Sequence, residues 1–114
     1  MTSFLDRAFY SADADVFRFK PAAVVTAARR GGTTAAYEQL LKYPGISHMP
    51  IVSSQYWNMV YGNTPEEVRQ DREGLQTMRT LGRNMAFLMK AIQLGRAQYG
   101  LPQPEPPQVT SFHH

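Results

Sequence analysis

The stretch PAAVVTAARRGGTTAAYEQLLKYPGISHMPIVSS, residues 21–54, decides the fold class of this chain. It opens with one short apolar run, Pro21 to Ala28, and closes with another, Met49 to Ser54. The first run shows no alternation of apolar and polar residues, which predicts a strand buried on both faces. The second run predicts another short strand.

Between these runs the sequence predicts one helix, over Ala35 to Tyr43. Thr33 or Thr34 supplies a hydroxyl that can cap its first turn, and Pro44 with Gly45 is expected to end it. Strand, helix and strand in this order predict a parallel pair joined by a right-handed crossover. The fold class is therefore α/β.

Helices are expected on both sides of this unit. Thr2 to Tyr10 is amphipathic, with its apolar residues on one helical face. Farther along, NTPEE (Asn63 to Glu67) forms a capping box. Thr64 takes the N-cap, Pro65 the first helical position, and Glu67 reaches back to the cap.

The helix that follows this cap is expected to run to Tyr99 and to end at Gly100. Apolar residues recur in it at three- and four-residue spacing: Val68, Leu75, Met78, Leu81, Met85, Leu88, Met89 and Ile92. Prolines at positions 102, 104, 106 and 107 then predict an extended tail. We therefore expect one domain over residues 1–100 and a Pro-rich tail over residues 101–114.

Composition limits the function classes. With 114 residues, 43% of them hydrophobic, the chain has room for one folded domain. The absence of cysteine excludes disulfides, thiolate metal sites and a cysteine nucleophile. The net charge of +3 is spread along the chain, which argues against a nucleic-acid-binding arm. With no apolar run of membrane-spanning length and no signal peptide, a cytoplasmic protein is expected.

The first candidate site is the junction between the first predicted strand and the helix after it. In parallel α/β proteins ligands bind at the carboxyl ends of strands. Gly31 and Gly32 would let the backbone turn tightly and offer amide donors to a flat or anionic ligand, and Arg29 and Arg30 could hold a phosphate or carboxylate. The alternative is a simple turn flanked by two solvated arginines.

The second candidate site is the loop Gln55 to Gly62, expected at the carboxyl end of the second strand. Tyr56, Trp57 and Asn58 form a stacking surface or a partner interface, or else they pack beneath the long helix. No metal-ligand spacing links the three histidines, and no known catalytic motif is present, so neither a metal site nor a catalytic side chain is expected.

Four segments carry a resemblance to a known family. They are FLDRAFY (4–10), KPAAVVTAARRGGTT (20–34), MPIVSSQYWNMVYGNTPEEVRQD (49–71) and GLQTMRTLGRNMAFLMK (74–90). Together they resemble the flavodoxin-like NAD(P)H-dependent FMN reductases, in the family's order, from Phe4 to about Lys90. The resemblance implies a flavodoxin-like three-layer fold. It also implies that the chain starts in the family's third helix, so that the fold is truncated to two parallel strands, a crossover helix and a long C-terminal helix.

The resemblance also implies a cofactor and its contacts. The loop that contacts the FMN ring would consist of Ala28, Arg29, Arg30, Gly31, Gly32 and Thr33, and Tyr56, Trp57 and Asn58 would lie near the flavin or a dimer partner. The family's phosphate loop, of the Gly-Ser-Pro type, would be absent from this chain.

The expected function is that of an oxidoreductase. Electrons would pass from NAD(P)H through FMN to a small-molecule electron acceptor, with the chain assembled as a homo-oligomer. The alternative is a truncated, non-catalytic flavodoxin-like module that acts in protein-protein interaction.

Overall fold

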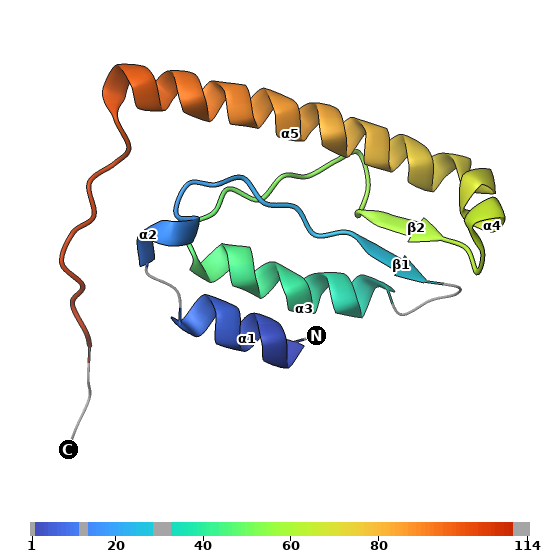
Figure 1. Ribbon diagram of the computed structural model, residues 1–114, viewed down its shortest axis with the longest axis horizontal. Coiled ribbons are helices and arrows are strands. Elements are labelled where there is room, and N and C mark those ends of the chain that lie inside the picture. The colour runs from blue at the N-terminus through green and yellow to red at the C-terminus, as the bar shows by residue number, and fades with distance from the viewer. Residues whose placement is uncertain (1, 12–13, 29–32, 111–114) are drawn as a thin grey trace.

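The computed structural model describes residues 2–11, 14–28 and 33–110. Helices on either side enclose a small two-stranded sheet (Figure 1). The elements in chain order are α1 (Thr2–Ser11), α2 (Ala14–Phe17), β1 (Thr26–Ala28), α3 (Thr33–Ile46), β2 (Met59–Tyr61), α4 (Pro65–Gln70) and α5 (Arg72–Tyr99).

The sheet confirms the predicted α/β class, but the strand predicted over Pro21 to Ala28 is shorter and more exposed than expected: β1 covers only Thr26–Ala28, and only Thr26 of it is buried. β1 pairs with β2 in parallel, with Thr26 opposite Met59 and Ala28 opposite Tyr61, and α3 lies in the connection between them. α5 lies on one side of the strands and α3 on the other, with α1 beyond α3 (Figure 1). This is the layering expected of a flavodoxin-like fold cut down to two strands.

The position predicted for the second strand, Met49 to Ser54, is wrong. Only Ile51 of that run forms a parallel bridge, with Ala22. The strand itself is β2, which lies inside the predicted loop 55–62. Hydrogen bonds from α5 explain the difference: the Asn84 side-chain amide donates to the Ser53 carbonyl at 2.8 Å, and the Ser54 hydroxyl donates to the carbonyl of Thr77 at 2.8 Å.

The chain therefore leaves the sheet after the bridge at Ile51 and returns at Met59, eight residues later. Between the Ala22–Ile51 bridge and the first pair of the sheet, residues 52–58 lie opposite residues 23–25. Residues 52–58 therefore form a loop that projects out of the sheet. The excursion buries apolar side chains at both ends, because Val52 is fully buried and Met59 and Val60 are buried in the strand.

The predicted end of the crossover helix is also wrong. α3 runs through Pro44 and Gly45 to Ile46. The carbonyl of Pro44 accepts hydrogen bonds from the backbone N–H of Ser47 and Met49, each at 3.2 Å. The chain turns out of the helix at His48, whose φ is 58°, a left-handed conformation typical of helix ends.

The predicted capping box is confirmed, but the single long helix after it is not. The Thr64 hydroxyl accepts from the Glu67 N–H at 3.2 Å, and the Glu67 carboxylate accepts from the Asn63 N–H. α4 then ends after one and a half turns, and a new cap at Asp71 starts α5. The Asp71 carboxylate accepts one bond from Gly74 N–H at 3.0 Å and another from the N–H of Tyr61 in β2 at 2.8 Å.

Aromatic contacts join α1 and α2 to α3. The Phe9 ring stacks on Phe17 with centroids 4.3 Å apart and lies 5.3 Å from the ring of Tyr43. The Tyr43 hydroxyl donates to the Asp6 carboxylate at 2.7 Å. This hydrogen bond, together with burial and the negative charge of Asp6, raises the pKa of Tyr43 to about 12.

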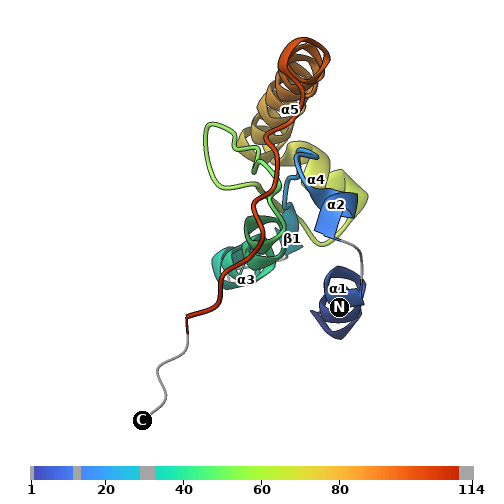
Figure 2. The same cartoon turned by 90° about the vertical axis from the view of Figure 1, so that its left-hand side faces the viewer.

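The fold is open for its size. Its accessible surface is 9047 Å² and its radius of gyration is 17.4 Å. A compact monomer of this mass would have an accessible surface of about 6,300 Å² and a radius of gyration of about 13 Å. Part of the excess comes from the outer part of α5, which rises above the other elements in Figure 2, and from residues 101–110, which have no regular secondary structure and lie apart from the body in Figure 1.

Candidate functional site

The first candidate segment joins β1 to α3. Ala28 is the last residue of β1, and its carbonyl accepts a hydrogen bond from Gly62 N–H at 3.1 Å. Thr33 is the first residue of α3. The other four predicted residues, Arg29, Arg30, Gly31 and Gly32, lie outside the described residues. The segment thus begins at the carboxyl end of β1 and ends at a helix N-terminus, where ligands bind in parallel α/β folds.

The second candidate segment lies before β2, so the prediction that it follows a strand is wrong. Tyr56 and Trp57 are half-exposed, with ring centroids 5.2 Å apart and planes inclined at 49°. The Asn58 carbonyl accepts a hydrogen bond from Thr26 N–H at 2.9 Å. The aromatic pair therefore lies at the amino end of β1 and not at its carboxyl end. The residues that lie beside Ala28 are instead Tyr61 and Gly62.

The side chain of Asn58 is the most unusual group in this region. The residue is fully buried. Within the described part of the chain, neither its amide oxygen nor its amide nitrogen has a hydrogen-bond partner. A buried polar group left in this state costs about 1–3 kcal/mol, so such groups are rare. Because the side chain is fully buried, its amide is not open to a ligand at the surface of the described chain.

A small cavity of about 190 Å³ lies between this segment and the start of α5. Its lining residues come from the loop, from β2 and from the first turns of α5: Tyr56, Met59, Tyr61, Asp71, Glu73, Gly74 and Thr77. Ligand sites for drug-sized molecules have about 300–1,000 Å³, so this cavity suits only part of a ligand.

Sequence reasoning missed Asp71 and Thr77. The sequence predicts a continuous helix through Asp71, although Asp is itself among the residues favoured at a helix N-cap. Thr77 is buried, and its hydroxyl donates to the Glu73 carbonyl at 2.9 Å. Its place beside the cavity had no sequence signal, because it depends on how α5 packs.

The described residues fit a flavin ring better than a flavin phosphate. Tyr56 and Trp57 provide an exposed aromatic surface on which a flat ring can stack. The charged residues that line the cavity, Asp71 and Glu73, are both acidic and would repel a phosphate.

Comparison with known families identifies one relationship. The family model of the NADPH-dependent FMN reductases matches residues 1–64. The chain belongs to this family. The match includes both candidate segments and ends at the cap of α4, so the resemblance to the FMN reductases beyond residue 64 stays a prediction. Comparisons with curated proteins and with solved structures found no match.

The described residues hold no group of three His, Asp or Glu side chains that could bind a metal ion. Among the helices that the structure describes, none has the length and apolar character needed to cross a lipid bilayer. Membership of the FMN reductase family implies flavin-dependent oxidoreductase chemistry and FMN as the cofactor.

Proposed function

We propose that this chain forms the ring-binding part of an NAD(P)H-dependent FMN reductase that passes electrons to a small-molecule acceptor. The observation that carries this proposal is the family match, because it spans the β1–α3 junction and the aromatic segment together. Bound FMN would supply the redox chemistry, taking hydride from the nicotinamide and releasing it to the acceptor.

In this proposal the protein binds and orients the flavin and takes no proton itself. Tyr56 and Trp57 stack on the ring system or cover its edge, and the buried Asn58 comes directly after them, next to the start of β2. Backbone groups at the β1–α3 junction approach the ring from the carboxyl end of β1. The acidic groups beside the cavity keep the phosphate away from this end.

We further propose that this chain is the C-terminal part of the active unit, and that its phosphate site lies in strands added beside β1. Thr26 and Ala28 direct their backbone groups to β2, so Ala27 faces the other edge. No described strand lies along that edge. An apolar groove of about 280 Å³ continues from it, lined by Leu5, Phe9, Ala22, Ala23, Val24, Val25, Leu40, Tyr43, Pro44 and Met49. The uncovered edge also supports assembly into a homo-oligomer.

Comparing FMN with riboflavin, which lacks the phosphate, tests the proposal. At the aromatic segment the two flavins should bind weakly and within about twofold of each other, because the phosphate makes no contact there. Quenching of flavin fluorescence measures both affinities. If the two flavins compete for one site and FMN binds at least about tenfold tighter than riboflavin, the flavin phosphate site lies beside the aromatic segment and that part of the proposal is contradicted.

The alternative is a non-catalytic module that acts through protein-protein interaction, and the large accessible surface favours it. Under this alternative neither flavin binds, and the chain self-associates or captures another protein through the edge of β1. Absence of binding for both flavins at millimolar concentration, together with a dimer in light scattering, would support the alternative and overturn the reductase proposal.

A further inference from the structure

A second cavity lies at the opposite end of the sheet. It has a volume of about 460 Å³ and is lined by Arg18, Phe19, Lys20, Ile92, Arg96 and Leu101. The first three of these residues form the turn that leads into the β1 segment, and the others come from the end of α5 and the residue after its cap. This cavity therefore lies at the amino end of the strands, away from the aromatic segment.

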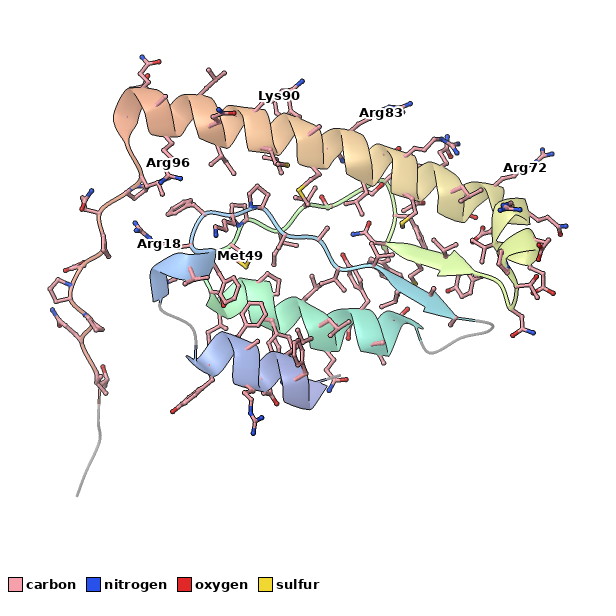
Figure 3. The ribbon with its side chains drawn as sticks, in the orientation of Figure 1. Arg18, Met49, Arg72, Arg83, Lys90 and Arg96 are labelled. Carbon is pink, nitrogen blue, oxygen red and sulfur yellow. The ribbon has the colours of Figure 1, made fainter. Side chains whose placement is uncertain are left out.

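Positive charge dominates this cavity. Three of its six described lining residues are cations, none of the six is acidic, and the cations come from two separate elements. Figure 3 shows Arg96 pointing from the end of α5 toward the segment that carries Arg18, whereas Arg83 and Lys90 of the same helix point away from the sheet. The helix dipole favours one cation at this end of α5, but it does not account for two more from another segment.

The turn that carries Arg18 and Lys20 is held in place by the backbone. Phe19 has a φ of 61°, a left-handed conformation that is uncommon for an aromatic residue. Its N–H donates to the His48 carbonyl at 2.8 Å, and the Lys20 N–H donates to the Phe17 carbonyl at 3.1 Å. The Arg18 guanidinium lies 5.3 Å from the centre of the Phe19 ring. The two cations thus sit on a fixed turn, which lowers the entropic cost of binding an anion.

The rest of the lining is apolar. Phe19, Ile92 and Leu101 give the cavity a surface suited to a hydrophobic or flat group, and its volume lies within the range of small-molecule sites. Arginine binds phosphate oxygens through paired N–H groups. We propose that this cation cavity, formed by Arg18, Phe19, Lys20, Ile92, Arg96 and Leu101, binds a small organic phosphate with an aromatic or apolar body.

Titration of the isotope-labelled chain with adenosine monophosphate, inorganic phosphate and adenosine tests the proposal by amide chemical shifts. The nucleotide should bind more tightly than either fragment, and the shifts should centre on residues 18–20 and 96–101. Arg96→Gln should weaken nucleotide binding about tenfold, the effect of one lost charge-assisted hydrogen bond. The matched control is Arg83→Gln, on the outward face of the same helix, which should change binding by less than about twofold.

Three results would overturn the proposal. They are no binding at millimolar nucleotide, equal losses of nucleotide affinity in Arg96→Gln and Arg83→Gln, and chemical-shift changes centred on residues 28–34. The last result would assign the anion to the β1–α3 junction instead. Arg96→Lys keeps the charge and should retain part of the affinity, which separates lost binding from lost folding. Because riboflavin binding is measured independently, failure here leaves the proposed reductase function standing, and the reverse also holds.

Discussion

The two ends of the sheet carry opposite chemistry, although α5 runs past both. Near the start of α5 the cavity is lined by aromatic and acidic groups, among them Tyr56, Asp71 and Glu73. Near its end the cavity is lined by Arg18, Lys20 and Arg96. The lining residues on α5 are about 25 Å apart along the helix axis. The features that suit a flavin ring and those that suit a phosphate therefore belong to separate sites.

Removing the cap at the acidic end should have the largest effect. Asp71→Ala deletes the acceptor for both Gly74 N–H and Tyr61 N–H, so the start of α5 and β2 lose their connection. We expect the free energy of unfolding to fall by about 2 kcal/mol or more in urea denaturation. Glu66→Ala, an exposed acidic residue on α4, should cost less than about 0.5 kcal/mol. Similar losses in both variants would show that Asp71 does not connect these elements.

Removing the aromatic surface should break ring binding alone. Trp57→Ala should weaken riboflavin binding about fivefold to tenfold, since an aromatic contact contributes about 1–1.5 kcal/mol. Tyr99→Ala serves as the control, because Tyr99 is an exposed aromatic residue at the far end of α5. If both variants bind riboflavin as well as the parent chain, the ring does not contact Trp57.

Asn58 should separate stability from binding. Asn58→Leu replaces the buried, unsatisfied amide with an apolar group of similar size, so the free energy of unfolding should rise by about 1 kcal/mol. Riboflavin affinity should change by less than about twofold in the same variant, because the buried amide does not line the cavity. Stability is measured in urea and affinity by fluorescence. A variant that is less stable than the parent would show that the amide is satisfied in the folded chain.

Tyr43 should give the smallest effect, at the amino side of the sheet. Its folded pKa of about 12 lies above the ordinary value of 10, so the protonated hydroxyl is the stabilised form. The contribution of the Tyr43–Asp6 hydrogen bond to the free energy of unfolding is fully present below pH 10 and is lost as the pH rises toward 12. Tyr43→Phe should lower the unfolding temperature slightly at pH 8, and the difference should shrink above pH 10. Tyr10→Phe, at a highly exposed site, should match the parent throughout.

Local signals in the sequence determined the elements that need few distant contacts. The amphipathic pattern of α1, the Thr64 capping box and the order of β1 followed by α3 all depend on residues within one or two turns of each other. Hydrogen bonds and side-chain faces at such short separation are fixed by backbone geometry, which is why these predictions hold.

Only the tertiary structure decided where the second strand lies, where the long helix breaks and where the cations meet. β2 forms at Met59–Tyr61 because Asn84 and Thr77, more than twenty residues away, bind the serines of the predicted strand. The Asp71 cap is fixed by its bond to Tyr61. Arg18 and Arg96 line one cavity although 78 positions separate them in the sequence. Each of these features depends on contacts between distant segments, and those contacts form only when the layers pack.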